Sequence, residues 1–286
     1  MSPLPIPYPP RSAGLVWHYT DEAGLRGILS SNRIWASPPE SLNDSSELTY
    51  GIQLVRDLWN SDRATFRPSD PGAGEYIDRV LGEGWEESLR GSTFIACASS
   101  VPDMLSQWRS YAGPDGFSIG FRIDESVWFG GPDRLVDGPM NARSLPYWFD
   151  VVYEPESQSE LVRAFFNYLA DLPPSSRAAN ALWSSRLTLS SLPTLFKHPG
   201  FREEKEMRWV GDDLLAGTPD ATVVHGHLPI GAYSFAPGEA NLAPFPVAKV
   251  FCGPHCTPDT LERVQRLLED LGLSHVEVEH STIPYR

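Results

Sequence analysis

The chain has few cysteines and no long apolar segment. Cys97, Cys252 and Cys256 are its only cysteines among 286 residues, too few for a disulfide framework, and the apolar run around Cys97 is typical of a buried thiol. No apolar run approaches the roughly 18 residues that cross a membrane, and the first ten residues lack the basic start and apolar centre of a secretory signal. These absences predict a cytoplasmic protein with no membrane partner.

Basic residues are also scarce. The chain has 23 Lys and Arg against 37 Asp and Glu, a formal charge of −14. Clustered Lys and Arg carry sequence-independent affinity for nucleic acid, so a broad phosphate-binding surface is excluded, although a local basic pocket remains open. No Gly-rich phosphate loop follows a strand, and no Ser or Cys nucleophile lies in a recognisable elbow.

Proline is concentrated at the N-terminus, where the first ten positions hold five prolines. This composition predicts a disordered tail over residues 1–13. The 41% of hydrophobic residues in the chain are enough for a sizeable core, so residues 14–286 are predicted to form a single globular domain. A mostly helical stretch at about 156–198 reads as an insertion or a packing layer.

Predicted strands and helices mix without the regular alternation of a doubly wound sheet, which indicates an α+β or mixed fold. Residues 15–19 alternate like a strand, and Thr20 is the predicted N-cap of the helix that follows. A further helix is predicted at about 75–89 and a strand at 93–99.

The most informative stretch runs from Lys197 to Val210, where charged side chains crowd the start of an apolar, strand-like run. Together with His18 at the end of the first predicted strand, it suggests one site built from two distant segments. The alternative is a solvated, mutually paired charge run at a helix-to-strand junction.

Several other residues have two open interpretations. His18 lies between Trp17 and Tyr19, where a hydrogen-bonded structural histidine is as good an interpretation as a ligand contact. Asn43 could line a cleft, and so could Asp44 and Glu47, although Asp44 followed by Glu47 also fits a capping box.

Trp108 and Tyr111 lie three residues apart on one face of a predicted helix. Core packing is favoured for Trp108, and exposure for Tyr111, which lies near a glycine turn. Farther along, Cys252 and Cys256 flank His255, and either His225 or His227 would complete a metal-ligand set. A strand-to-helix turn explains that segment equally well, so no metal is expected.

Five motifs follow one another along the chain. They are His18-Tyr19-Thr20, Leu42-Asn43-Asp44 with Glu47, Ser106-Gln107-Trp108-Arg109-Ser110-Tyr111, Gly116-Phe117-Ser118-Ile119-Gly120-Phe121, and Phe201 followed by Glu204-Lys205-Glu206-Met207-Arg208. Their order resembles the bacterial domain-of-unknown-function family 2971, over roughly residues 15 to 284, and the family name supplies no activity. The opening strand and helix are in turn similar to those of the ADP-ribosyltransferases, a superfamily that uses NAD.

The second resemblance implies a bent, split β core with NAD in the cleft. In that arrangement Glu206 stabilises the positive charge that develops on the ribose when nicotinamide leaves, and Glu204 activates the acceptor as a general base. Glu206→Gln is then expected to keep the fold and abolish turnover. The NAD-binding residues implied are His18, Tyr19, Thr20, Asn43, Tyr111, Lys197 and Arg208, with a tyrosine stacking on nicotinamide and the two cations meeting a phosphate.

Two classes of function follow. The first is NAD-dependent ADP-ribosyl transfer or NAD glycohydrolysis, as in a toxin or phage-defence effector, with a protein, nucleic acid or small molecule as the acceptor. The second is a non-catalytic recognition domain that uses His18, Lys197 and Arg208 to hold a phosphate-bearing ligand or nucleic acid. Metal-dependent hydrolysis is a third class, and it would require bound metal.

Overall fold

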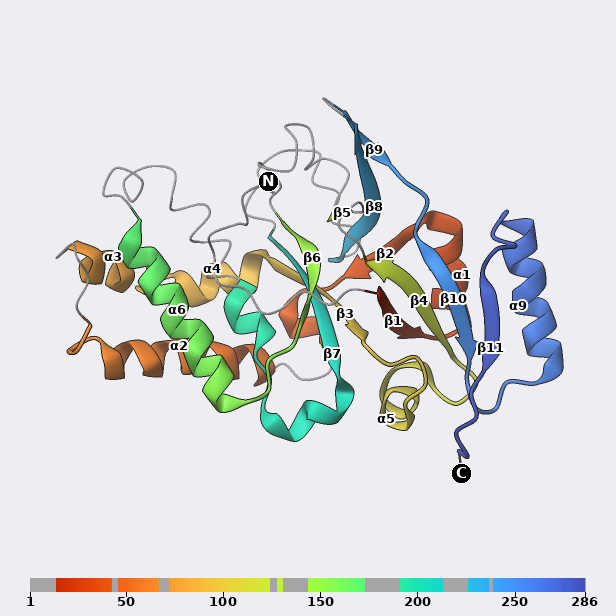
Figure 1. Ribbon diagram of the computed structural model, residues 1–286, viewed down its shortest axis with the longest axis horizontal. Helices are drawn as coiled ribbons and strands as arrows, with labels where there is room; N and C mark the ends of the chain where they lie inside the picture. Colours follow the sequence, from red (N-terminus) through yellow and green to blue (C-terminus); the bar gives the residue numbers. More distant parts are fainter. Residues whose placement is uncertain are drawn as a thin grey trace.

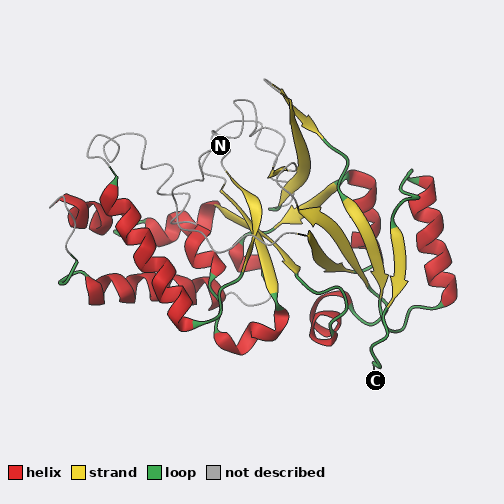
Figure 2. Cartoon of the chain, viewed as in Figure 1, coloured by secondary structure: helices red, strands yellow, loops and turns green. Residues whose placement is uncertain are grey.

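The computed structural model describes residues 14–42, 46–66, 72–123, 128–130, 144–172, 191–212, 226–236 and 239–285. Helices and two β-sheets make up this part of the chain, so the predicted α+β class is confirmed (Figure 2). The predicted tail at 1–13 and most of the second half of the predicted insertion, residues 173–190, lie outside the described residues. The proposed domain boundaries therefore stay a prediction.

The larger sheet has seven strands in the order β11-β10-β4-β1-β3-β7-β6. Neighbouring strands are antiparallel except for β10 and β11, which run parallel. The strands are β1 (Gly14–Thr20), β3 (Thr93–Ser99), β4 (Phe117–Ile123), β6 (Ser144–Asp150), β7 (Glu206–Asp212), β10 (Val247–Cys252) and β11 (Glu277–His280).

The smaller sheet has the order β2-β8-β5, and β9 also pairs with β8. Its members are β2 (Arg33–Ala36), β5 (Trp128–Gly130), β8 (Leu228–Ala236) and β9 (Glu239–Leu242). The two sheets meet where the backbones of Ser37 and Ile95 exchange two hydrogen bonds of 2.8 Å.

One face of the larger sheet packs against α1 (Glu22–Ser31) and α9 (Pro258–Asp270). Both helices are amphipathic and bury their apolar side chains in the main core. The N-cap of α1 is Asp21, whose carboxylate accepts a hydrogen bond of 2.7 Å from the amide of Gly24. The prediction of Thr20 as the N-cap was wrong by one residue, because β1 continues through Thr20 and Asp21 is the first residue free to cap.

A helical layer with its own core gathers at one end of the molecule (Figure 1). It contains α2 (Ser46–Asp62), α3 (Gly72–Val80), α4 (Trp85–Ser92), α6 (Pro155–Asp171) and the 3₁₀ turn η5 (Leu192–Leu195). The single helix predicted at about 75–89 is two helices, because α3 ends at Val80 and Gly84, with φ 86°, lies outside helical geometry as the N-cap of α4. No helix in the described part of the chain is long and apolar enough to cross a membrane.

Short helical turns cover the second face of the larger sheet. They are η1 (Pro39–Ser41), α5 (Leu105–Gln107), the π-helical turn η2 (Trp108–Ala112) and the 3₁₀ helix η6 (Pro199–Glu204). Trp108 is fully buried, and its ring meets that of Tyr19 edge-on with centroids 4.8 Å apart. The predicted core role of Trp108 is confirmed.

Candidate functional site

Five charged side chains form a buried ion network between the helical layer and the second face of the larger sheet. Glu47 comes from α2, Lys197 precedes η6, Glu204 ends η6, and Glu206 and Arg208 begin β7. Three carboxylates and two cations give the network one net negative charge. Buried charges persist in proteins when they are paired in this way, because each lone charge would be costly to desolvate.

Lys197 is the centre of the network. Its Nζ atom lies 2.7 Å from Glu47 Oε1, 2.7 Å from Glu204 Oε2 and 3.1 Å from Glu206 Oε2, and its side chain is only 2% exposed. The ammonium also sits 4.9 Å from the centroid of the Phe201 ring. All three donors of the ammonium therefore have a carboxylate partner.

Arg208 closes the network from the sheet side. Its Nε lies 2.6 Å from Glu206 Oε1 and its Nη2 lies 2.9 Å from Glu206 Oε2, a bidentate pair. Nη2 also bonds to Glu47, and Nη1 donates to the carbonyl of Thr194 at 2.6 Å. A planar guanidinium suits this fork, in which one cation joins two carboxylates and a backbone carbonyl.

The environment displaces the pKa values of Glu204 and Glu206 in opposite directions. Burial raises the pKa of Glu206, but Arg208 and Lys197 outweigh it and lower that pKa to about 2. Burial raises the pKa of Glu204 above its usual range, and the partial compensation by Lys197 is not enough to restore it. Glu206 is therefore firmly ionised, whereas Glu204 takes up a proton more readily than an ordinary glutamate.

The two carboxylates meet at Lys197 because of the backbone between them. Lys205 adopts the left-handed conformation, with φ 45° and ψ 48°, at the end of η6. Glu204 ends a helical turn and only Glu206 lies on a strand, so the two glutamates do not lie on one extended segment. The hydroxyl of Ser99 holds this junction by donating to the carbonyl of Glu204 at 2.9 Å.

The charged run at 202–208 divides into exposed and buried parts. Arg202, Glu203 and Lys205 are exposed, as expected of a solvated charge run, whereas Glu206 and Arg208 are buried. The alternation of a strand accounts for the buried pair, because residues two apart share a face.

Aromatic groups surround the network where it approaches solvent. The Tyr111 ring is 43% exposed, which confirms its predicted exposure, and Phe201 is 38% exposed. Burial of its hydroxyl and the nearby charge of Glu204 raise the pKa of Tyr111. On the inner side, the Tyr153 hydroxyl accepts a hydrogen bond of 2.9 Å from the amide of Glu206.

The fully buried side chain of Gln158 hydrogen-bonds to the backbone of Lys197. Gln158 on α6 donates to the carbonyl of Lys197 at 2.9 Å and to that of Val152 at 2.7 Å, and it accepts from the Tyr50 hydroxyl at 2.8 Å. These bonds fix the backbone of Lys197 relative to α2 and α6.

The structure does not bring His18 into the network. Register pairs Trp17 with Ser99 and Ser99 with Glu206, so the alternating His18 lies on the opposite face of the sheet. Its Nδ1 donates to the carbonyl of Cys97 at 2.9 Å, and burial lowers its pKa. This is the geometry of the hydrogen-bonded structural histidine, and a ligand role for His18 stays a prediction.

Tyr19 and Thr20, two further residues predicted to bind NAD, have their described hydrogen-bond and strand partners outside the network. Tyr19 is buried, and its hydroxyl donates to the carbonyl of Val101 at 2.9 Å. Thr20 pairs with Phe117 at the end of β1, on the face of the main core. Asn43 and Asp44 lie outside the described residues.

Glu47, for which a cleft position and a helix cap were both open, contributes its carboxylate to the network, and its proposed cap partner Asp44 lies outside the described residues. The Glu47 carboxylate bonds to Lys197 and Arg208 and is 9% exposed. Cys97 was not predicted as a neighbour of the site, although it pairs with Arg208 across the sheet, and burial followed by the charge of Glu206 raises the pKa of its thiol. The register between β3 and β7 would have identified Cys97, because Cys97 pairs directly with Arg208. No local sequence pattern distinguishes Glu47 from a helix-capping residue.

Cys252 and Cys256 lie at the end of β10 and in the turn before α9, as the turn interpretation predicted. Thr257 is the N-cap of α9 with a capping box. Among the described residues, no group of three or more His, Cys, Asp or Glu side chains has the arrangement of a metal site. His225 lies outside the described residues, so the metal interpretation stays untested.

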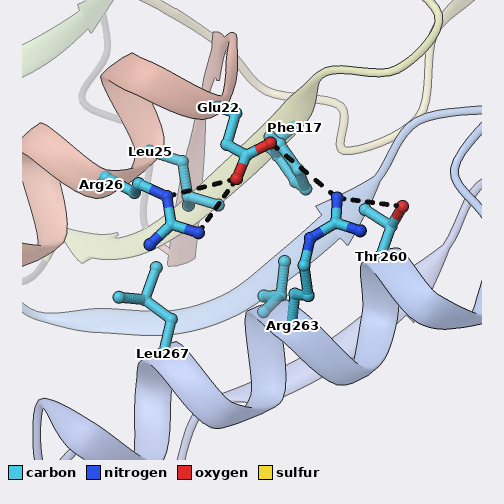
Figure 3. Close-up of a pocket in the computed structure, with 8 residues that line it drawn as sticks. Glu22, Leu25, Arg26, Phe117, Thr260, Arg263 and Leu267 are labelled. Atoms are coloured by element: carbon cyan, nitrogen blue, oxygen red, sulfur yellow. Dashed lines mark hydrogen bonds and ion pairs between the residues drawn. The ribbon is translucent and has the colours of Figure 1, made fainter.

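A small hollow lies away from the network, between α1 and α9. Figure 3 shows Arg26 and Arg263 approaching Glu22 from either side, at 3.0 Å and 3.9 Å. Its volume of about 10 Å³ has room for about one water molecule, so it does not compete with the network as a ligand site.

Residues 107–209 match the model of a family described as "Protein of unknown function (DUF2971)". The chain is similar to this family over the matched segment. The matched segment contains Tyr111, Lys197, Glu204, Glu206 and Arg208, whereas His18 and Glu47 lie outside it. No curated protein matches the chain. The family description names no activity, so the function has to be argued from the ion network.

Proposed function

We propose that the protein cleaves the bond between nicotinamide and ribose in NAD and passes ADP-ribose to an acceptor or to water. Glu204 is the carboxylate that meets the substrate. The observation that supports this choice is its accessibility, because the side chain of Glu204 is 19% exposed while those of Glu47 and Glu206 are 9% and 7% exposed. Among the three carboxylates of the network, Glu204 is the one that a ligand reaches first.

The chemistry explains why a carboxylate belongs there. Positive charge develops on the ribose as nicotinamide leaves, so a fixed negative charge beside it stabilises the transition state more than the ground state. The raised pKa of Glu204 also suits a general base, which takes a proton from the acceptor more effectively when its pKa lies closer to neutral pH.

Glu206 has a supporting role in this proposal. It is buried and bonded to both Lys197 and Arg208, so its charge holds the two cations in place. Lys197 in turn holds Glu204 at 2.7 Å. Pairs of carboxylates with oppositely displaced pKa values are the common basis of acid and base roles within one site.

Tyr111 supplies the surface on which an aromatic ring stacks. Its exposed ring follows Gln107 by one turn, and the side-chain amide of Gln107 donates to the carbonyl of Glu204 at 3.5 Å, so the turn that carries Tyr111 adjoins Glu204. Nicotinamide and a tyrosine ring associate through offset or edge contacts of about 0.5–1.5 kcal/mol beyond their buried area.

The alternative of a phosphate-binding recognition domain gains no support from the two cations it relied on. Lys197 and Arg208 are each 2% exposed and already paired with carboxylates. A phosphate would have to displace these partners and enter a network with a net negative charge.

The direct test is nicotinamide release from NAD by the purified protein, with and without cell lysate as a source of acceptors. Glu204→Gln keeps the size of the side chain and removes its charge, so release should fall at least about a hundredfold, as for other general bases. Glu203→Gln is the matched control, because Glu203 is the exposed neighbour.

Equal release by wild type and Glu204→Gln would reject Glu204 as the carboxylate. No release at all, together with no thermal stabilisation by NAD, would reject the enzyme and favour the recognition domain.

A further inference from the structure

The exposed ring of Tyr111 is carried on an uncommon piece of backbone. Residues Trp108–Ala112 form a π-helical turn, in which the amide of Gly113 donates to the carbonyl of Trp108 at 2.8 Å. Such turns are rare, and they occur frequently at functional sites. Conversion of this turn to an α-helical register would rotate Tyr111 about the helix axis relative to Glu204.

Trp108 is the fixed point of the turn. It is fully buried against Tyr19, and its indole N–H donates to Asp103 Oδ1 at 2.7 Å. A buried indole needs such a partner, since leaving its N–H unpaired costs roughly 1–3 kcal/mol.

Asp103 also binds the C-terminal segment. Its Oδ1 accepts a hydrogen bond of 2.7 Å from the Ser281 hydroxyl, and its Oδ2 accepts one of 3.2 Å from the amide of Thr282. Ser281 is 3% exposed, so this contact is shielded from solvent. One carboxylate therefore joins the start of the turn to a segment nearly 180 residues away in sequence.

A second contact between the same two segments lies one residue closer to Tyr111. The guanidinium of Arg109 lies 5.6 Å from the centroid of the Tyr285 ring, and His255 meets that ring edge-on at 5.1 Å. Ile283 and Tyr285 also pack against the cluster that contains Trp108. The C-terminal segment thus covers the turn along its length.

We propose that Asp103 is a positioning residue for the site. By holding the Trp108 indole and the C-terminal segment together, it maintains the π-helical register that places the Tyr111 ring beside Glu204. This inference rests on the proposed function, in which Tyr111 contacts the nicotinamide ring of NAD.

A double-mutant cycle separates positioning from a general contribution to stability. Asp103→Ala should raise the KM for NAD about tenfold, because the turn loses its anchor. The same substitution in a Tyr111→Ala background should have little further effect, since the group that Asp103 positions is already absent. A role in stability alone would raise KM by the same factor in both backgrounds, and that result would overturn the inference.

The conservative variant sharpens the test. Asp103→Asn retains an oxygen that can accept from both Trp108 and Ser281 and loses only the bond from Thr282, so its KM should stay within about threefold of wild type. Asp115→Ala, which removes an exposed aspartate on the following turn, is the matched control and should leave KM unchanged.

Failure of the proposed function would be recognised separately. Should wild-type protein release no nicotinamide, the turn is examined by hydrogen exchange at the amide of Gly113, which donates the π-helical bond. Asp103→Ala should accelerate that exchange at least tenfold, and Asp115→Ala should not. Unchanged exchange in Asp103→Ala would overturn the positioning role independently of any activity.

Discussion

Glu204 and Glu206 bind the same ammonium group, Lys197 Nζ, at 2.7 Å and 3.1 Å, yet their pKa values are displaced in opposite directions. The difference arises from Arg208, which forms two hydrogen bonds to Glu206 and none to Glu204 among the described contacts. One carboxylate is thereby committed to holding the network together. The other remains able to exchange a proton with a ligand.

The first prediction concerns stability. Glu206→Gln should lower the free energy of unfolding by about 3 kcal/mol, because three donors from Lys197 and Arg208 approach the carboxylate and an amide has one acceptor oxygen. This replaces the expectation from sequence that the substitution leaves the fold intact. Urea denaturation at neutral pH measures the change.

Glu203→Gln is again the control and should change the free energy of unfolding by less than about 0.5 kcal/mol, as surface substitutions generally do. A Glu206→Gln protein as stable as this control would show that the ion network contributes little to the fold.

The second prediction concerns pH. The pKa of Glu206 falls from 4.5 to about 2 in the folded protein, which corresponds to roughly 3 kcal/mol of stability. Because the folded pKa is lowered, this contribution is fully present above pH 4.5 and is lost as pH falls toward 2. Glu204 has the opposite sign, since its pKa is raised, and it lowers stability as pH increases above 4.5.

Denaturation curves from pH 2 to 7 test both directions of pH dependence, the gain of stability from Glu206 and the loss from Glu204. Glu206→Gln should flatten the rise in stability between pH 2 and 4.5, and Glu204→Gln should flatten the decline above it. Parallel pH profiles for wild type and Glu206→Gln would contradict the lowered pKa.

Local patterns in the sequence predicted the elements well where side-chain periodicity decides them. The fold class, the buried Trp108 and the exposed Tyr111 followed from apolar spacing and from a nearby glycine turn. The predicted N-cap of α1 was one residue too early. Thr20 and Asp21 are both good capping residues, and only the length of β1 decides which of them caps the helix.

The ion network could be predicted only in part. Lys197, Glu204, Glu206 and Arg208 are close in sequence, so their clustering was visible. Glu47 joins them from a distant helix, and its place depends on how α2 packs against η5. The local sequence around Glu47 does not indicate how α2 packs against η5.

The third prediction tests that packing at Gly51 on α2. A Cβ atom at this position would lie 2.0 Å from the carbonyl oxygen of Pro193, so Gly51→Ala must displace the backbone of η5. We expect a loss of about 1–3 kcal/mol, as for other overpacked cores. Thermal unfolding measures the change.

Gly27→Ala on α1 is the matched control. Gly27 is also within a helix, but a Cβ atom there meets nothing within 4 Å. Alanine should stabilise that helix by roughly 0.5–1 kcal/mol, since it restricts the unfolded chain more than glycine. Similar effects of the two substitutions would mean that α2 does not approach η5 as closely as the structure indicates.

The fourth prediction links Lys197 to the pH dependence of nicotinamide release. If Glu204 acts as the general base, release by wild type should increase with pH through a midpoint above 4.5, because burial raises the pKa of Glu204. Lys197 Nζ lies 2.7 Å from Glu204 and stabilises its ionised form, so it limits how far the pKa of Glu204 is raised. Lys197→Gln removes that charge, so the midpoint should move to a higher pH by roughly one to two pH units, the equivalent of one charge-assisted hydrogen bond.

Rates are measured at a temperature where both proteins remain folded, since loss of a buried cation also lowers stability. Lys205→Gln removes an exposed lysine on the same segment and should leave the midpoint in place. A midpoint that is identical in wild type and Lys197→Gln, at a reduced rate, would show that the titrating group is not Glu204. Release that falls as pH rises, in place of the increase expected for a general base, would reject the role of Glu204 as the base.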